Sequence, residues 1–245
     1  MKLKYIYKIA AMLLFVVIVL HLCFMFLFYN SNQNPFYEGT NKKWSHRGVS
    51  INCSENTICS IQEALNQNYS GVEIDVWFYN QDLIVRHDRN SSAILTLNEV
   101  FEKFPNSKFW IDLKNLNSNN VDAITELFLK LKLKNSNFII ESKNAYVLSK
   151  LYQKGFKCCL WLSPSKSVFS KSFLKEIYNK YLITCYKFNA ISMPLQVYNS
   201  ERVMNEYGHL NIHLWTDLDT NTINYQKISA IEEVKIILDD QEFFK

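Results

Sequence analysis

Eight short runs of β-branched, aromatic and aliphatic residues recur along the chain, and longer amphipathic stretches lie between them. Strands that are separated by helices pair in parallel, because each helix returns the chain to the end of the sheet where the next strand begins. Eight such units in about 200 residues are what a (β/α)8 TIM barrel requires. The alternation therefore predicts an α/β fold of this class, with an open doubly wound sheet as the alternative.

The same pattern gives the expected elements. Strands are expected at residues 43–47, 71–79, 108–114, 137–142, 157–163, 190–194, 211–217 and 234–240. Helices are expected at residues 60–68, 97–104, 121–131, 145–153, 169–181, 200–207 and 223–231. Residues 82–88 fit either a continuation of the strand at 71–79 or a hairpin partner for it.

The amino-terminal segment does not fit this alternation. Residues 9–29 contain no charged residue, and as a helix they would reach about 30 Å, the thickness of the hydrocarbon core of a bilayer. Bulky residues throughout favour an uncleaved signal anchor over a cleaved signal peptide. We therefore expect a transmembrane helix at 1–30, a polar linker at 31–42 and the barrel at 43–245.

Lysines before the apolar segment predict the orientation of the anchor. Lys2, Lys4 and Lys8 keep the amino terminus in the cytoplasm by the positive-inside rule, so the protein is expected to be single-pass with its barrel outside, periplasmic or extracellular. Basic and acidic residues are equally numerous after residue 43, which gives no support to nucleic-acid binding. Export permits disulfides, and Cys53–Cys59 is the first candidate pair, although the sequence does not fix the pairing.

Charged residues occur at alternate positions in two of the predicted strands. Glu73 and Asp75 lie two apart, so their side chains point to one face of the strand at 71–79. Asp112 and Lys114 repeat this spacing in the strand at 108–114. Carboxylates that converge in a barrel mouth repel one another unless a cation lies between them, which favours a metal site with oxygen ligands over a solvated acidic edge.

Two histidines are expected near these carboxylates. His46 ends the first strand and His87 ends the segment after the second, at the carboxyl ends of strands where barrel enzymes keep their active sites. His209 and His213 have no acidic companions in register and are interpreted as structural. Trp215 fits either the barrel core or the wall of a substrate pocket.

In the order of these residues the chain resembles the glycerophosphodiester phosphodiesterase family, within the phospholipase-C-like TIM-barrel group. The matching features span nearly all of residues 43–245: HRG at 46–48, ENT at 55–57, EID at 73–75, HD at 87–88, DLK at 112–114 and WT at 215–216. Three departures are evident. Asp112 stands where the family usually has Glu, FYNQD replaces the usual T-x-D-G turn, and the insertion after HD is missing, which predicts a more open mouth.

The resemblance implies a membrane-anchored, metal-dependent phosphodiesterase that hydrolyses glycerophosphodiesters or related phospholipid head groups. It implies that Glu73, Asp75 and Asp112 hold one divalent cation, Mg²⁺ or Ca²⁺, and that His46 and His87 are the general acid and base. Substrate contacts are expected from Arg47, Lys114 and Trp215. The alternatives are a sphingomyelinase-D-like lipid phosphodiesterase that forms a cyclic phosphate, and a catalytically inactive ligand-binding barrel.

Overall fold

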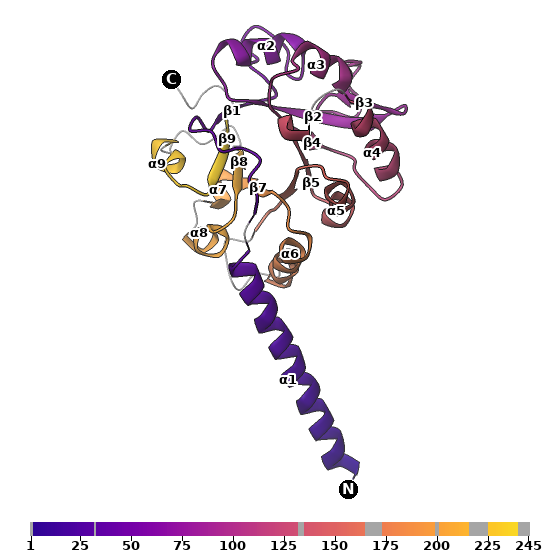
Figure 1. Ribbon diagram of the computed structural model, residues 1–245, viewed down its shortest axis with the longest axis vertical. Coiled ribbons are helices and arrows are strands. Elements are labelled where there is room, and N and C mark those ends of the chain that lie inside the picture. Colours follow the sequence, from indigo (N-terminus) through magenta and orange to yellow (C-terminus); the bar gives the residue numbers. More distant parts are fainter. Residues whose placement is uncertain are drawn as a thin grey trace.

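The computed structural model describes residues 2–31, 33–131, 135–164, 173–198, 201–215 and 225–239. Within these residues, eight parallel strands form a closed barrel, since β1 pairs with both β2 and β9 (Figure 1). The predicted TIM barrel is confirmed, and the open sheet is excluded by this closure. The barrel strands are β1 (Lys43–His46), β2 (Val72–Tyr79), β4 (Phe109–Leu113), β5 (Phe138–Ser142), β6 (Cys158–Trp161), β7 (Ala190–Pro194), β8 (Ile212–Trp215) and β9 (Val234–Asp239).

The remaining strand, β3 (Asp82–Val85), is a hairpin partner of β2. It pairs antiparallel with the far end of β2, from Tyr79 opposite Asp82 to Val76 opposite Val85. Asn80 and Gln81 form the turn with φ values of 49° and 63°, as the two central residues of a tight type I′ hairpin require. The open question about residues 82–88 is therefore resolved in favour of the hairpin.

Helices surround the barrel strands, as the amphipathic stretches predicted (Figure 1). Thr57 and Thr96 begin α2 and α3 with capping boxes, in which each threonine side chain accepts a hydrogen bond from the third residue of its helix. The helices around the barrel are α2 (Ile58–Asn66), α3 (Leu97–Lys103), α4 (Val121–Lys130), α5 (Ala145–Gln153), α6 (Phe173–Tyr186), α7 (Leu195–Tyr198), α8 (Glu201–Tyr207) and α9 (Tyr225–Ser229), with a 3₁₀ turn η1 (Asn135–Asn137) before β5.

The strand residues divide into two buried sets because side chains alternate along a strand. Ile74, Ile111 and Ile140 belong to the large set between the sheet and the helices. The inner set fills the barrel and receives Phe36 from the preceding segment, whose ring centroid lies 6.0 Å from that of Trp44. The members of the inner set are Phe36, Trp44, Trp110, Ile139, Cys159, Ala190, Ile236 and Leu238.

The polar composition of residues 31–42 had suggested a free linker. Residues 33–37 instead contact the barrel. The carbonyl groups of Gln33 and Asn34 accept hydrogen bonds from the side chains of Asn211 and Asn189. Both asparagines immediately precede strands, β8 and β7, so this segment covers the amino-terminal end of the barrel. The segment leaves the carboxyl-terminal end of the barrel uncovered, where a functional site can lie.

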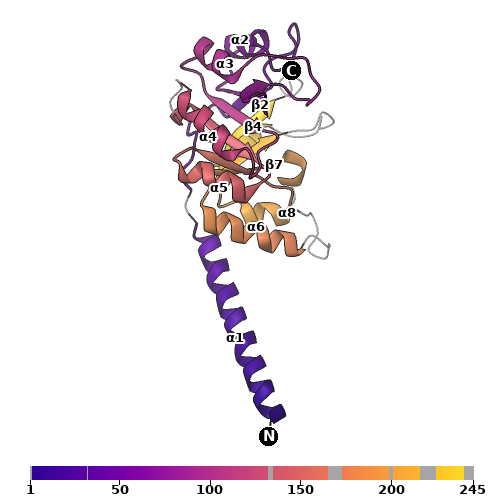
Figure 2. The same ribbon diagram turned by 90° about the vertical axis from the view of Figure 1, so that its right-hand side faces the viewer.

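Helix α1 (Lys2–Tyr29) extends away from the barrel and is long and apolar enough to span a membrane (Figures 1 and 2). Its last three turns contact the domain. Phe28 is fully buried, and Nδ1 of His21 lies 2.8 Å from the hydroxyl oxygen of Tyr181 on α6. The helix is therefore packed against the barrel at one end and exposed along the rest of its length.

Candidate active site

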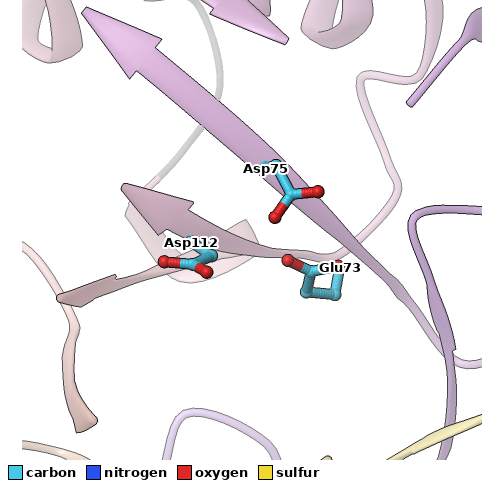
Figure 3. A group of neighbouring side chains, drawn as sticks. All are labelled: Glu73, Asp75 and Asp112. Carbon is cyan, nitrogen blue, oxygen red and sulfur yellow. The ribbon is translucent and has the colours of Figure 1, made fainter. Parts of the chain in front are cut away.

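Three carboxylates meet at the carboxyl-terminal end of β2 and β4. Glu73 and Asp75 share one face of β2, and Asp75 lies directly opposite Asp112 in the parallel register. Ligand oxygens from these three residues lie within 4.8 Å of one another. Figure 3 shows the three side chains gathered on the same side of the two strands. The structure thus brings together the acidic residues that the alternation had singled out.

Two cations neutralise part of this negative charge. Nζ of Lys114 lies 2.6 Å from Oδ1 of Asp75 and 2.5 Å from Oδ2 of Asp112, and Nε of Arg47 lies 3.0 Å from Oδ2 of Asp75. Burial acts to raise the pKa of Asp75, but Lys114 and Arg47 outweigh it and hold that pKa below its usual value. Asp75 is therefore the carboxylate that the protein itself keeps ionised.

Glu73 has the opposite electrostatic environment. Its side chain is buried, and burial together with the neighbouring charges of Asp75 and Asp112 raises its pKa well above the usual value. Burial is also the main cause of the raised pKa of Asp112, which the Lys114 ammonium only partly offsets. A further positive charge beside Glu73 and Asp112 would stabilise their ionised forms.

The three carboxylates fit a hard divalent cation. Their ligands are all oxygen atoms, which Mg²⁺ and Ca²⁺ prefer. The ammonium of Lys114 between Asp75 and Asp112 also shows that positive charge is accommodated at this position. Glu73, Asp75 and Asp112 are the residues that would hold such an ion.

His46 lies beside the acidic cluster. It ends β1 opposite Glu73, and its Nε2 lies 3.8 Å from Oε2 of Glu73. The chain then turns sharply, with φ values of 57° at Arg47 and 80° at Gly48. A Cβ atom at Gly48 would lie 2.5 Å from the backbone carbon of Ser60, so glycine is required both by the φ angle and by the close approach of α2.

The loop after this turn supports Asp75, a role that sequence analysis did not assign. The side-chain amide of Asn56 donates a hydrogen bond of 2.8 Å to Oδ2 of Asp75, and the Asp75 amide donates one of 3.0 Å back to Oδ1 of Asn56. The Cys53–Cys59 disulfide closes the loop around Asn56, which confirms the first candidate pair. The ENT motif at 55–57 was the available sequence signal for Asn56.

His87 is placed differently from His46. The amide of the preceding residue, Arg86, donates to the carbonyl of Asp75, so the chain passes close to the acidic cluster. The imidazole itself is 44% exposed, and its Nδ1 lies 2.9 Å from Oδ1 of Asp88. His87 is not among the described residues that line the cavity beside His46 and Glu73. The structure therefore brings His46, but not the side chain of His87, to the carboxylates.

A cavity of about 210 Å³ opens above the carboxylates. Trp215 lines it and stacks with Trp161 at a centroid distance of 6.2 Å, so Trp215 is a pocket wall. Thr216, the second residue of the WT motif, lies outside the described residues. The described residues that line this catalytic cavity are His46, Arg47, Glu73, Trp110, Asp112, Lys114, Glu141, Lys143, Trp161, Trp215 and Leu238.

Glu141 is a further acidic residue of the cavity that sequence analysis missed. It lies on β5 directly opposite Asp112 and is 3% exposed. Burial and the charge of Asp112 raise the pKa of Glu141 to about 8. The available signal was a lone carboxylate within the apolar run FIIES, in the same strand-end position as Asp112.

His213 lies inside the barrel below this cavity, in the structural role that its sequence context predicted. It is fully buried, its ring centroid lies 5.0 Å from that of Trp110, and burial lowers its pKa to about 3. His209 lies at the other end of the domain, where its Nε2 is 2.9 Å from the carbonyl oxygen of Phe28. Neither histidine contacts the carboxylates.

No protein-family model and no curated protein matches the chain in sequence. Solved structures with the same fold include a glycerophosphodiester phosphodiesterase from Thermotoga maritima, at 20% identity and a TM-score of 0.60, with 82% of this chain and 95% of that chain covered. A second, from Parabacteroides distasonis, has 17% identity and a TM-score of 0.57, with 82% and 92% covered. A phosphodiesterase from Oleispira antarctica, in complex with the product sn-glycerol-3-phosphate, has 15% identity and a TM-score of 0.58, with 83% and 92% covered. These similarities establish a shared fold.

Proposed function

We propose that the chain is a phosphodiesterase that hydrolyses glycerophosphodiesters or related phospholipid head groups with the help of one divalent cation, Mg²⁺ or Ca²⁺. The observation that carries this proposal is the group of three carboxylates within 4.8 Å of one another, beside His46 at the open end of the barrel. The shared fold with glycerophosphodiester phosphodiesterases supports the same reaction class.

Charge neutralisation is the first task of the site. A bound cation supplies a Lewis acid that polarises the phosphate. Lys114 and Arg47 hold the Asp75 carboxylate ionised and add positive charge beside the place where a phosphate would bind. Such fixed charges favour the transition state, because negative charge grows on the phosphate oxygens as the attacking oxygen adds.

Proton transfer is the second task. His46 lines the cavity, and an imidazole is the side chain that most often serves as a general acid or base. We assign the other proton-transfer role to His87, because Arg86 fixes the neighbouring backbone against Asp75. This assignment requires the imidazole to leave Asp88 and turn toward a bound substrate.

We also propose that α1 is an uncleaved single-pass anchor with its amino terminus in the cytoplasm and the barrel outside. Phe28, the penultimate residue of α1, is fully buried against Tyr207 and His209. Cleavage at or after the end of the helix would remove this packing. Lys2, Lys4 and Lys8 at the other end provide the charge asymmetry for this orientation.

The proposed function is tested by replacing the two histidines in the full-length chain, assayed in detergent against sn-glycero-3-phosphocholine. His46→Ala is expected to lower kcat about 100-fold or more with little change in Tm, since general acid or base catalysis contributes at least that much. His87→Ala is expected to have a loss of similar size. Leu129→Ala, an exposed position on α4, is the control.

The outcomes separate the alternatives. Unchanged turnover in His46→Ala would contradict the assigned chemistry, and absence of turnover in the wild-type protein would favour a ligand-binding barrel. Phosphorus NMR of the product distinguishes direct hydrolysis from formation of a cyclic phosphate. The sphingomyelinase-D-like alternative predicts the cyclic product. Two departures from the family pattern support testing it: Asp112 stands in place of Glu, and the insertion after HD is missing.

A further inference from the structure

A second groove adjoins the catalytic cavity on the side of α5 and α6. Its volume is about 510 Å³, and Lys143 and Trp161 line both spaces. The walls beyond this junction are largely apolar and aromatic, whereas the catalytic cavity is rich in charged groups. The described residues that line the groove are Lys143, Asn144, Ala145, Tyr146, Leu160, Trp161, Leu162, Ser163, Tyr178, Asn179 and Leu182.

The outer rim of the groove is exposed and aromatic. Tyr146 on α5 is 57% exposed and Tyr178 on α6 is 59% exposed. Leu174, one turn before Tyr178, is 75% exposed and lies on the same face of α6 by helical spacing. Tyrosine is enriched where a protein meets the interface of a membrane, because its ring is apolar and its hydroxyl is polar.

Helix α6 also contacts the membrane-spanning candidate. Tyr181, one turn after Tyr178, contacts His21 and Phe24 of α1, and its ring centroid lies 4.6 Å from that of Phe24. Figures 1 and 2 show α6 on the side of the barrel from which α1 leaves. The helix that carries one wall of the groove is therefore the helix that lies against the anchor.

The length of α1 places α6 close to the membrane surface. The candidate span runs from Lys4 to Tyr29, and its residues 4–20, which precede the contacts with α6, reach about 26 Å as a helix. The hydrocarbon core of a bilayer is about 30 Å thick. The contacts of α1 with Tyr181 therefore lie near the end of a full span, which places this part of α6 beside the membrane interface.

We propose that the groove between α5 and α6 holds the acyl chain of a phosphodiester that resides in the membrane, while its phosphate lies in the catalytic cavity. The substrate class is a single-chain glycerophospholipid. This inference rests on the proposed function for the catalytic cavity. Lys143, whose Nζ lies 4.1 Å from the ring centroid of Trp161, places a cation at the junction, where the apolar chain gives way to the anionic head group.

The first test measures kcat/KM of the full-length protein for lysophosphatidylcholines of increasing chain length below their micellar concentrations. The wild-type value is expected to rise up to about fourfold for each methylene group that enters the groove. Tyr178→Asp is expected to flatten this dependence and to leave the hydrolysis of sn-glycero-3-phosphocholine unchanged. Leu129→Asp on α4, which is 63% exposed, is the matched control and should behave as the wild type.

A wild-type rate that is independent of chain length would overturn the proposal, and so would an equal dependence in wild type and Tyr178→Asp. If the protein hydrolysed only the water-soluble diester, the acyl-chain site would be contradicted but the proposed phosphodiesterase function would not. A groove covered by a second copy of the chain would appear as a concentration-dependent increase in mass that Tyr178→Asp abolishes, and this outcome would also contradict an acyl-chain site.

A binding measurement separates failure of the groove from failure of catalysis. Tryptophan fluorescence of the His46→Ala protein is recorded with a lysophosphatidylcholine brominated near the end of its chain. Quenching is expected at concentrations that leave the His46→Ala, Tyr178→Asp double variant unquenched, because Trp161 lines the groove. Equal quenching of both proteins would overturn the acyl-chain site even if the enzyme hydrolyses diesters.

Discussion

Lys114 connects the carboxylates of the site at the level of single residues. Its ammonium group contacts both Asp75 and Asp112, and three acidic neighbours raise its pKa although burial acts to lower it. Lys114 is therefore charged throughout the physiological pH range. The cluster of Glu73, Asp75 and Asp112 accordingly has two cations of its own, Lys114 and Arg47, for three carboxylates, and a divalent ion would supply the remaining positive charge.

His213 makes the stability of the barrel dependent on pH. Its pKa is about 3 in the folded protein, against about 6.5 in an unfolded chain. Below pH 6.5 the unfolded chain takes up a proton that the buried imidazole does not, so the free energy of unfolding falls as the pH is lowered toward 3. We expect this residue to lower stability by about 2 kcal/mol at pH 5 relative to pH 8.

The measurement is chemical denaturation of wild type and His213→Leu across this pH range. The difference in unfolding free energy between the two proteins should change in favour of the variant as the pH falls. His209→Leu, at a partly buried position near α1, serves as the comparison. A constant difference between pH 8 and pH 5 would show that His213 is not buried in its neutral form.

Sequence analysis missed Glu141 because the sequence pattern does not give the register between neighbouring strands. Glu73 and Asp75 were recognisable because two carboxylates shared one strand face, whereas Glu141 was a single carboxylate whose position depends on the register between β4 and β5. The exposed imidazole of His87 illustrates the converse. It was expected at the end of a strand-like segment; β3 ends at Val85, and the direction of the His87 side chain depends on the β2–β3 hairpin.

At the level of elements, the loop between β1 and α2 holds the ligand cluster in position. Asn56 binds both the carboxylate and the backbone amide of Asp75, and the Cys53–Cys59 disulfide closes the loop on either side of Asn56. The loop therefore couples a covalent crosslink to the orientation of one carboxylate.

Replacing Cys53 and Cys59 by serine is expected to lower the unfolding free energy by about 2 kcal/mol, because the crosslink closes only a short loop. The KM for a phosphodiester should also rise, since Asn56 loses part of its restraint. Chemical denaturation measures the stability, and steady-state kinetics measure the KM. Cys185→Ser, at an exposed free cysteine, is the control. A double variant with the kinetics of the wild type would show that the disulfide does not help to position Asp75.

The elements themselves were largely predictable from the sequence. All eight barrel strands fall within the predicted ranges, because buried parallel strands give continuous apolar runs. The packing of residues 33–37 was not predictable, since Gln33 and Asn34 act through hydrogen bonds to Asn211 and Asn189, about 155 to 178 residues away in sequence. Polar composition alone does not reveal such partners.

At the level of the whole molecule, helix α1 packs against the barrel at its carboxyl-terminal end. Phe28 lies with its ring centroid 4.9 Å from that of His209 and 5.9 Å from that of Tyr207. Lys180 of α6 places its Nζ 5.4 Å from the same ring. The docked end of α1 therefore fixes the direction in which the helix leaves the barrel.

Phe28→Ala is expected to lower the stability of the detergent-solubilised protein by about 3 kcal/mol, since a fully buried aromatic ring is removed. Phe26→Ala is the matched control, because Phe26 is 67% exposed on the same helix. Thermal unfolding followed by circular dichroism measures both. Equal Tm values for the two variants would mean that α1 does not pack against the barrel.

The central claim is that the carboxylates of Glu73, Asp75 and Asp112 hold a divalent cation that phosphodiester hydrolysis requires. The most direct measurement is the rate of sn-glycero-3-phosphocholine hydrolysis by EDTA-treated full-length protein as Mg²⁺ or Ca²⁺ is added back, for wild type and Glu73→Gln. We predict no turnover before addition, full recovery in the wild type, and a requirement for at least about tenfold more metal in the variant. Hydrolysis at the full rate in the presence of EDTA would contradict the claim.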